Sequence, residues 1–413
     1  MNQPIEQRRL GTRTFILLIV MLCAFAPIST DMYLPALGTM VEELHTDAST
    51  LNMTLYGYMM TLAVSMLVMG PVIDKYGRKG FLLADLVLYI ASSAACAMVG
   101  DVYSLILFRV LQAFASGGVM TIAMAFVKDS FRGPDVAKVL GIQAVIGVLG
   151  PVIAPIAGAA LIDLSGWRLT LVAPALFALV CLALSLLVTE TLPDDERVVG
   201  GFGRMMVGMK GIARDRYFMM FLVMICMFNM PFMAYLSVSS YIYVDVFGLT
   251  GSEYSLMLAI AMIVGVSAMS LIGRLTRNVV NWRMIPLYLV LGAVGSVLLL
   301  TIGDSSWYAF LVSFIFILTA SVAVRPWGMG VLMRSHPGDS GAVSSMMNSM
   351  FFVWGTIGMV LSTIGWSSYI LGLGVLGVVA SVVYLALFLA VRGNGASTVT
   401  ELDGTPTGED RSR

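Results

Sequence analysis

The chain has 413 residues, of which 59% are hydrophobic and only 12% are charged, and its formal net charge is zero. A soluble domain carries about 25% charged residues, so this composition excludes an ordinary soluble protein and predicts an all-α protein in a lipid bilayer. No basic domain is present, which excludes a nucleic-acid partner. No metal ligand spacing occurs either, because the cysteines lie singly in apolar runs, as Cys23, Cys96, Cys181 and Cys226.

Twelve apolar runs long enough to cross a bilayer follow one another along the chain. A spanning helix needs about 20 mainly apolar residues. In chain order, as spans 1 to 12, the runs are 14–37, 50–72, 80–99, 103–126, 137–162, 167–189, 217–243, 253–273, 284–303, 306–328, 341–362 and 367–391. The first run is long enough to span and others follow it, so we expect no cleaved signal peptide.

Lysine and arginine predict the orientation of these spans, because they concentrate on the cytoplasmic side. With a cytoplasmic N-terminus, 22 of the 24 basic residues fall on the inside, counting Arg325 at the inner end of span 10. The two exceptions are Arg109 in span 4 and Arg168 at the start of span 6. The outside loops hold mainly acids. We therefore expect a multi-pass protein of the cytoplasmic (inner) membrane with both termini in the cytoplasm.

The longest interior loop divides the chain into two halves of six spans. This loop, 190–216, is charged and contains glycine, so we predict an N-terminal half at 1–189, a cytoplasmic linker, and a C-terminal half at 217–392. The polar tail, 393–413, is expected to be disordered. Two similar halves are what a rocking transporter needs.

The loop between spans 2 and 3 places one acid, three bases and two glycines in ten residues. Its pattern consists of Gly70, Asp74, Lys75, Gly77, Arg78 and Lys79. It resembles the signature loop of major facilitator superfamily transporters. The resemblance implies that Gly70 lets span 2 lie close to span 11. It also implies that Asp74 meets the N-terminus of span 11 near Ser340, which carries unpaired N–H groups, and latches the two halves.

Span 1 contains an ionisable residue, Asp31, within the stretch 29–37. A charge at mid-helix costs roughly 2.5 to 3.5 kcal/mol by insertion scales, so Asp31 needs a partner, water or a proton. Alternatively, it lies near the outer end of the span and contacts solvent or caps a kink at Pro35. The stretch resembles the span 1 signature of the Bcr/CflA (bicyclomycin/chloramphenicol resistance) drug:proton antiporters. The resemblance implies that this acid handles the proton and the substrate.

Span 4 contains Arg109 and Gln112, followed by the small residues 116–118. This resembles the superfamily's pattern of arginine, two residues, glutamine and glycines, although Ala113 replaces the usual glycine. The resemblance implies that Arg109 couples proton binding to helix movement. The alternative is a structural arginine bound to backbone carbonyls. Whether Arg109 reaches Asp31 stays open at this point.

Span 5 combines small residues with two prolines, as Gly147, Gly150, Pro151, Pro155 and Gly158. Small residues at this spacing let two helices approach closely, and proline bends a helix. The run resembles the antiporter motif of the superfamily, which is associated with exporters. The alternative is the small-residue packing of any polytopic protein.

Aromatic residues and 31 methionines suit a pocket that repacks around different ligands. The predicted substrate-binding residues are Tyr33, Tyr56, Phe228, Tyr235, Phe351 and Trp354. For any one of them, the alternative is packing against lipid or in the core. Two charged residues near span ends, Asp85 and Arg325, are expected to reach the membrane interface. If Arg325 instead faces a cavity, it would disfavour cationic substrates.

The sequence thus predicts a transporter and not an enzyme, since it has no ATP-binding loop, metal cluster or nucleophile constellation. We expect a monomeric, proton-driven exporter of small amphipathic compounds of the chloramphenicol or bicyclomycin kind, with the proton as coupling ion and no cofactor. One alternative is a dedicated exporter of a single metabolite or siderophore. A second is a non-transporting membrane receptor or enzyme.

Overall fold

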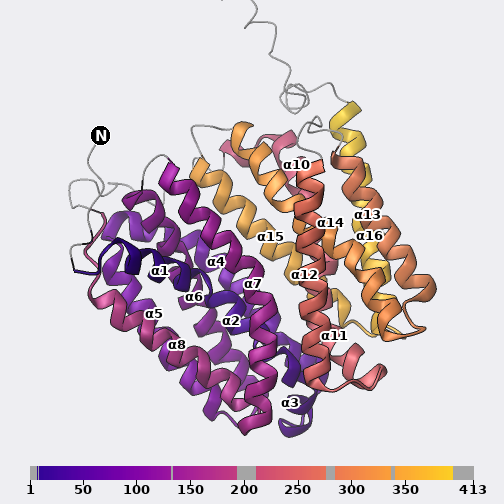
Figure 1. Cartoon of the computed structure of the whole chain (residues 1–413). Helices are drawn as coiled ribbons and strands as arrows, with labels where there is room; N and C mark the ends of the chain where they lie inside the picture. Colours follow the sequence, from indigo (N-terminus) through magenta and orange to yellow (C-terminus); the bar gives the residue numbers. More distant parts are fainter. Residues whose placement is uncertain are drawn as a thin grey trace, which may run out of the picture. The chain divides into compact units, whose positions relative to one another are not determined.

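The computed structural model describes residues 7, 9–131, 134–192, 211–275, 284–335 and 340–393. These residues form helices and turns, and no strand occurs among them (Figure 1). The chain forms two compact units. The first comprises Met1–Met205 with Leu249–Ala259, and the second Met206–Gly248 with Ile260–Arg413.

The first unit holds α1 (Thr12–Cys23), α2 (Phe25–Asp31), η1 (Leu34–Ala36), α3 (Leu37–Glu43), α4 (Ala48–Tyr76), α5 (Lys79–Met98), α6 (Val102–Ser130), α7 (Pro134–Ser165), α8 (Arg168–Leu186) and the start of α12 (Gly251–Leu275). The second holds α10 (Arg216–Cys226), α11 (Asn229–Tyr241), η3 (Ile242–Val246), the rest of α12, α13 (Met284–Ile302), α14 (Trp307–Ser335), α15 (Ser340–Ser362) and α16 (Tyr369–Gly393).

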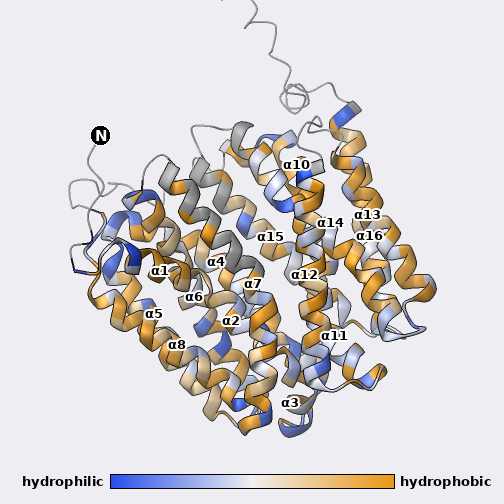
Figure 2. Ribbon diagram, in the orientation of Figure 1, coloured by the Kyte–Doolittle hydropathy of each residue, from blue (hydrophilic) through white to orange (hydrophobic). Residues whose placement is uncertain are grey.

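The predicted twelve spans are confirmed. Among the described residues, ten helices are long and apolar enough to cross a bilayer, and two shorter apolar helices lie at Leu149–Ser165 and Met346–Ser362. The ten include Thr12–Glu43 and Arg216–Val246, each built from several consecutive helical segments. Apolar residues cover most of each helix, and hydrophilic residues gather mainly at helix ends (Figure 2).

Aspartates at the starts of two spans satisfy free backbone N–H groups. Asp47 accepts from the Thr50 amide at 2.9 Å at the start of α4, and Asp101 accepts from the Ser104 amide at 2.9 Å at the start of α6. The side-chain and backbone hydrogen bonds of Thr50 lower the pKa of Asp47, and those of Ser104 lower the pKa of Asp101. Both carboxylates therefore stay charged at neutral pH and fix where these helices begin.

Prolines break span 1 and span 7 at comparable places. A proline removes the N–H that would bond to the carbonyl four residues earlier. Pro27 frees the carbonyl of Cys23, where α1 ends, and Pro231 frees that of Met227, where α10 has just ended. A further proline, Pro35, frees the carbonyl of Asp31, and α2 ends at that residue. The chain itself thus sets the position of the buried acid at a helix end.

The two units repeat one helix packing. In the first, a Cβ added at Gly158 of α7 would lie 1.8 Å from the Met32 carbonyl oxygen of span 1. In the second, a Cβ added at Gly358 of α15 would lie 2.0 Å from the Met230 carbonyl oxygen of span 7. Span 5 therefore packs on broken span 1 as span 11 packs on broken span 7, an arrangement expected of two related six-helix halves.

Candidate functional site

Asp31 is buried at the C-terminal end of α2, with 4% of its surface exposed. One carboxyl oxygen, Oδ1, accepts a hydrogen bond from the Thr30 hydroxyl at 2.8 Å. Within the part of the chain that the structure describes, this carboxyl forms no ion pair. It is therefore neither an open solvent contact nor half of a salt bridge, and protonation is the remaining way to neutralise it.

Arg109 is buried on α6 between two aromatic rings. Its guanidinium carbon lies 4.6 Å from the ring centre of Tyr33 and 4.4 Å from that of Tyr58. Nη1 donates to Gln112 Oε1 at 2.6 Å, while Nε and Nη2 have no hydrogen-bond partner among the described residues. Arg109 is thus bound neither to Asp31 nor to backbone carbonyls. Cation–π contacts hold it, and two strong donors remain available.

Hydroxyl groups and an amide support this arrangement from four spans. The Tyr33 hydroxyl bonds with Thr54 Oγ1 at 3.0 Å, and Gln112 Nε2 donates to Ser93 Oγ. A further hydrogen bond joins Ser29 next to Asp31 on span 1 with Tyr89 on span 3. These bonds fix the two arginine neighbours, Tyr33 and Gln112, and so fix the guanidinium itself.

Tyr58 is a site residue that is not among the predicted substrate-binding residues, which include its neighbour Tyr56. Along α4 the buried positions include Leu51, Leu55, Tyr58 and Leu62, which recur every three or four residues. Tyr56 lies two positions from Tyr58, and so about 200° away around the helix. The spacing of the apolar residues along the sequence thus distinguishes the two tyrosines, because Tyr58 shares the face of the buried leucines and Tyr56 does not.

The small-residue face of α7 lies against the segment that carries Asp31. Gly150 packs on Pro27, where a Cβ would meet the ring at 2.8 Å, and Gly158 packs on the Met32 carbonyl. The two prolines, Pro151 and Pro155, lie inside the helix between these contacts, and Gly147 lies one turn before them. The motif thus brings α7 close to span 1 at the break beside the acid.

We predict that Gly158→Ala loosens this contact. The added methyl group overlaps the Met32 carbonyl oxygen, which is backbone and cannot rotate away, so the two helices must separate. Such overpacking costs about 1–3 kcal/mol. Thermal unfolding of the purified variant measures the loss. Gly80→Ala is the matched control, because a Cβ there meets nothing within 4 Å. Equal unfolding temperatures for both variants would contradict the prediction.

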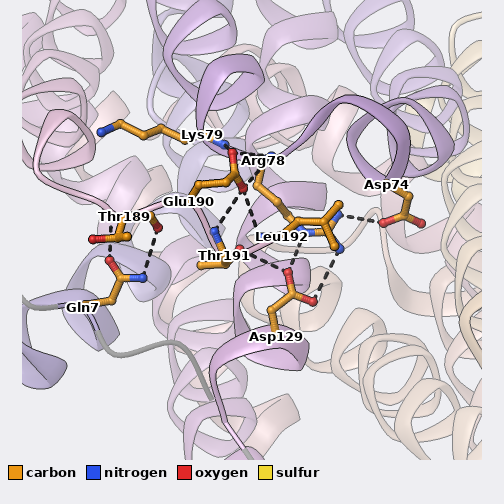
Figure 3. A network of polar contacts seen from close by, with 9 residues as sticks. All are labelled: Gln7, Asp74, Arg78, Lys79, Asp129, Thr189, Glu190, Thr191 and Leu192. Carbon is orange, nitrogen blue, oxygen red and sulfur yellow. Dashed lines mark hydrogen bonds and ion pairs between the residues drawn. The ribbon is translucent and has the colours of Figure 1, made fainter. Parts of the chain in front are cut away.

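Arg78, in the loop after span 2, is the centre of a polar network (Figure 3). Glycine ends the preceding helix, since Gly77 has φ +100°, a conformation that side chains rarely adopt. Arg78 Nη1 then binds Asp74 Oδ1 at 2.7 Å, and Nε binds Asp129 Oδ2 at 2.6 Å. Burial alone lowers the pKa of Arg78, but Asp129 and Asp74 more than offset this, so the pKa is raised.

Glu190 closes the same network from the segment after span 6. Its carboxylate accepts from the backbone N–H of Arg78 and of Lys79, both at 3.0 Å, at the start of α5. Lys79 Nζ donates to the Leu186 carbonyl at 2.9 Å. A carboxylate at a helix N-terminus is favourable because it meets free N–H groups and the positive end of the helix dipole. The sequence reasoning missed Asp129 and this capping role of Glu190.

The role of Gly70 in a close approach to span 11 remains a prediction. A Cβ added at Gly70 would meet nothing within 4 Å, whereas its neighbours Pro71 and Ile73 are buried. These two side chains, which lie on another face of α4, make the packing contacts of this turn. Asp74 is paired with Arg78, and 45% of its side chain is exposed. Its role as a latch remains a prediction.

The predicted substrate-binding residues fall into two groups. Phe228 and Tyr235 are fully buried, and their rings pack on Tyr384 at 5.1 Å and on Phe314 at 3.8 Å. They belong to the core, because every residue of α11 is buried and Phe228 adjoins it. Phe351 and Tyr33 instead lie beside arginines. The remaining two, Tyr56 and Trp354, are partly exposed.

Asp85 does not reach the membrane interface, contrary to expectation. It is buried on α5, with 4% of its surface exposed, among apolar neighbours on its own helix that include Leu82 and Leu86. Its Oδ2 has no partner among the described residues, and a Cβ at Gly118 of α6 would meet that oxygen at 2.0 Å. The missing side chain of Gly118 is what makes room for this carboxyl between two helices.

Comparison with known proteins identifies the family to which this helical protein belongs. Residues 17–359 match the Major Facilitator Superfamily, so the chain belongs to that family of membrane transporters. An uncharacterized MFS-type transporter of Bacillus subtilis, YdgK, is 27% identical over 304 residues, which cover 73% of this chain and 75% of that protein. Transporters of this family are not enzymes, and they generally need no cofactor.

Two further relatives are drug-resistance proteins, which agrees with the resemblance to the Bcr/CflA subfamily. A chloramphenicol resistance protein of Pseudomonas aeruginosa is 32% identical over 155 residues, 37% of each chain. A bicyclomycin resistance protein homolog of Haemophilus influenzae is 22% identical over 358 residues, 84% of this chain and 88% of that protein. Among solved structures, a peptide transporter POT in complex with sulfate superposes with a TM-score of 0.74 at 13% identity, covering 94% and 98% of the two chains.

Proposed function

We propose that this transporter exports small amphipathic, drug-like compounds from the cytoplasm in exchange for protons, by alternating access. One observation carries the proposal: Asp31, a buried carboxyl that forms no ion pair among the described residues, ends a broken helix in span 1, beside α7 and its small residues. Relatives named for chloramphenicol and bicyclomycin resistance support this substrate class. We place it in the inner membrane as a monomer with both termini in the cytoplasm.

In this mechanism Asp31 exchanges its proton for the drug. The acid takes a proton from outside when its site opens outwards. When a drug enters from the inside, it competes with the proton for this site, and binding of the drug displaces the proton from Asp31. The two unbonded donors of Arg109 then stabilise the carboxylate across the polar interior of the unit. Because α2 ends at Asp31 with a free carbonyl, this end is the part of span 1 that rearranges with least loss of hydrogen bonds.

On the cytoplasmic side, Asp74 acts as the latch in our proposal. Its exposed side chain is free to change partners, while Arg78 is held by Asp129 whether or not Asp74 is present. Asp74→Asn should shift the resting population towards the inward-open state. Distances between spin labels on the cytoplasmic loops measure this shift, and unchanged distances would contradict the latch.

The driving force suits neutral compounds better than cations. A membrane potential of about 100 mV contributes ~2.3 kcal/mol per charge, and one pH unit contributes ~1.4 kcal/mol. One proton therefore sustains a gradient of roughly 500-fold for a neutral drug. Exchange of one proton for a monovalent cation moves no net charge, so it gains only the pH contribution, roughly tenfold.

Substrate-triggered proton release tests the proposal. Purified protein in weakly buffered detergent is exposed to neutral, cationic and anionic drugs, and the pH change is recorded. Several unrelated drugs should each release protons. Release by one metabolite alone would instead favour the dedicated exporter. If no solute releases protons or crosses the membrane with purified protein in vesicles, the non-transporting receptor becomes the better reading.

A further inference from the structure

Arg325 of α14 is oriented by two residues of α15 in the second unit. Its guanidinium carbon lies 4.0 Å from the ring centre of Phe351, and Nη2 donates to Asn348 Oδ1 at 2.9 Å. Asn348 and Phe351 are three residues apart, so they share one face of the helix. The Phe351 backbone is fixed in turn, because its carbonyl accepts from Asn229 Nδ2 at 2.6 Å. Two contacts from α15, which is itself bonded to α11, thus orient the arginine.

Among the described residues, no carboxylate pairs with this arginine. Between residues 217 and 392 the acids are Asp245, Glu253, Asp304 and Asp339. Those that the structure describes lie at helix ends, and none forms an ion pair with Arg325. Arg325 lies ten residues before Ser335, the last residue of α14. That separation is about 15 Å along the helix axis, a length of roughly half the thickness of a bilayer's hydrocarbon core.

The remaining guanidinium donors of Arg325 have no hydrogen-bond partner among the described residues and are not fully buried. Among the described residues Arg325 makes a single hydrogen bond, to Asn348, and its Nε and Nη1 are not among the fully buried polar atoms that lack a partner. The residue is partly exposed. In an arginine with a purely structural role, these N–H groups would donate hydrogen bonds to backbone carbonyls. Here the Nε and Nη1 donors lie on different edges of the planar guanidinium and remain without a partner in the described part of the chain, so each can donate to an oxygen of an anionic group.

We propose that Arg325, Asn348 and Phe351 form a subsite that binds the anionic group of an amphipathic organic anion, such as a carboxylate or a sulfonate. The inference rests on the proposed export function and names the substrate class of that function. Arg325 supplies the charge and the donors, Asn348 sets the orientation of the fork, and Phe351 offers an apolar face to the body of the compound. The missing counter-ion of the arginine is then the substrate itself.

Such a substrate draws the largest driving force from one proton. An anion leaving while a proton enters moves two positive charges inwards, so the potential acts twice and the pH gradient once. With about 100 mV and one pH unit, the limiting gradient is roughly 10⁴-fold, against 500-fold for a neutral compound. The arginine therefore selects the charge type that this exchange moves most effectively.

Binding of two dyes with one ring system tests the subsite. The purified full-length protein in a neutral detergent is titrated with fluorescein, which is anionic, and with rhodamine 6G, which is cationic, and polarisation is recorded. The wild type should bind fluorescein at least about tenfold more tightly. Arg325→Gln should weaken fluorescein about 10- to 100-fold, the effect of losing charge-assisted hydrogen bonds, and change rhodamine 6G less than about twofold. Arg274→Gln, an exposed residue of the same unit, is the matched control.

Several outcomes would overturn the subsite. Unchanged fluorescein binding to Arg325→Gln is one, and equal weakening of both dyes is another, because it would mean a structural arginine. Displacement by phosphatidylglycerol but not by a second organic carboxylate would assign the site to lipid. If Arg325→Gln does not fold, the test uses Asn348→Ala, which should weaken fluorescein binding, and the preference of the wild type between the two dyes. A wild type that binds rhodamine 6G more tightly than fluorescein contradicts the proposal.

The same titrations separate this inference from the proposed export. Binding in detergent needs no gradient, so Arg325-dependent fluorescein binding without drug-triggered proton release would sink the export proposal alone. Proton release by chloramphenicol with no role for Arg325 in fluorescein binding would leave proton-coupled export in place and remove only the anionic subsite.

Discussion

Asp31→Asn is expected to abolish uphill export while leaving a folded protein that still binds drug. The gradient of a neutral drug should fall from roughly 500-fold to near unity, because without a titrating group the proton gradient no longer enters the cycle. Asparagine has nearly the same size, and its carbonyl oxygen accepts the Thr30 hydroxyl as the carboxyl does. Accumulation of a labelled drug in vesicles under an imposed pH gradient measures the loss.

Exchange without a gradient distinguishes lost coupling from lost binding. Vesicles loaded with unlabelled drug should still take up labelled drug through the Asp31→Asn variant, because exchange needs a working site and no proton. Asp85→Asn is the comparison, as it removes a second carboxyl that is buried among the described residues of the first unit. Uphill export that survives in Asp31→Asn and disappears in Asp85→Asn would move the proton site to Asp85, next to Gly118.

The helical fold was predictable because the bilayer permits so few solutions. A backbone in lipid must satisfy its own hydrogen bonds, so each apolar run of sufficient length becomes a helix. The broken spans were harder to predict. Pro27 and Pro231 signal a lost hydrogen bond, yet sequence alone does not say whether a helix bends or stops at a proline. In the structure α1 ends at Cys23 and α10 at Cys226.

The candidate site was predictable in kind but not in its contacts. Asp31 and Arg109 stand out because charges inside spans are costly. Their separation in the structure depends on rotation about helix axes, which places Tyr58 and not Asp31 beside the guanidinium. Contacts of long sequence separation were missed for a similar reason. Glu190 reaches the Arg78 amide across 112 residues, and no local pattern encodes that partner.

Arg78→Ala is expected to be the most destabilising single change in the polar network around Arg78. It leaves the Asp129 carboxylate, whose side chain is only 14% exposed, without a positive partner. Removing one member of a buried ion pair costs about 3–5 kcal/mol. For a unit of this size that corresponds to a fall in unfolding temperature of roughly 6–20 °C. Thermal unfolding of the purified variant in detergent, followed by helical circular dichroism, measures it.

Asp74→Ala is the matched variant, and it separates stability from transport. Its side chain is 45% exposed, so its ion pair with Arg78 is worth at most about 1 kcal/mol. Arg78 keeps its bond to Asp129 in that variant, so the unfolding temperature should hardly change. If Asp74→Ala nonetheless impairs export, the aspartate acts in the conformational change and not in folding. If it destabilises the protein as much as Arg78→Ala, the exposed pair with Asp74 and not the pair with Asp129 supports the loop, and the latch loses its separate role.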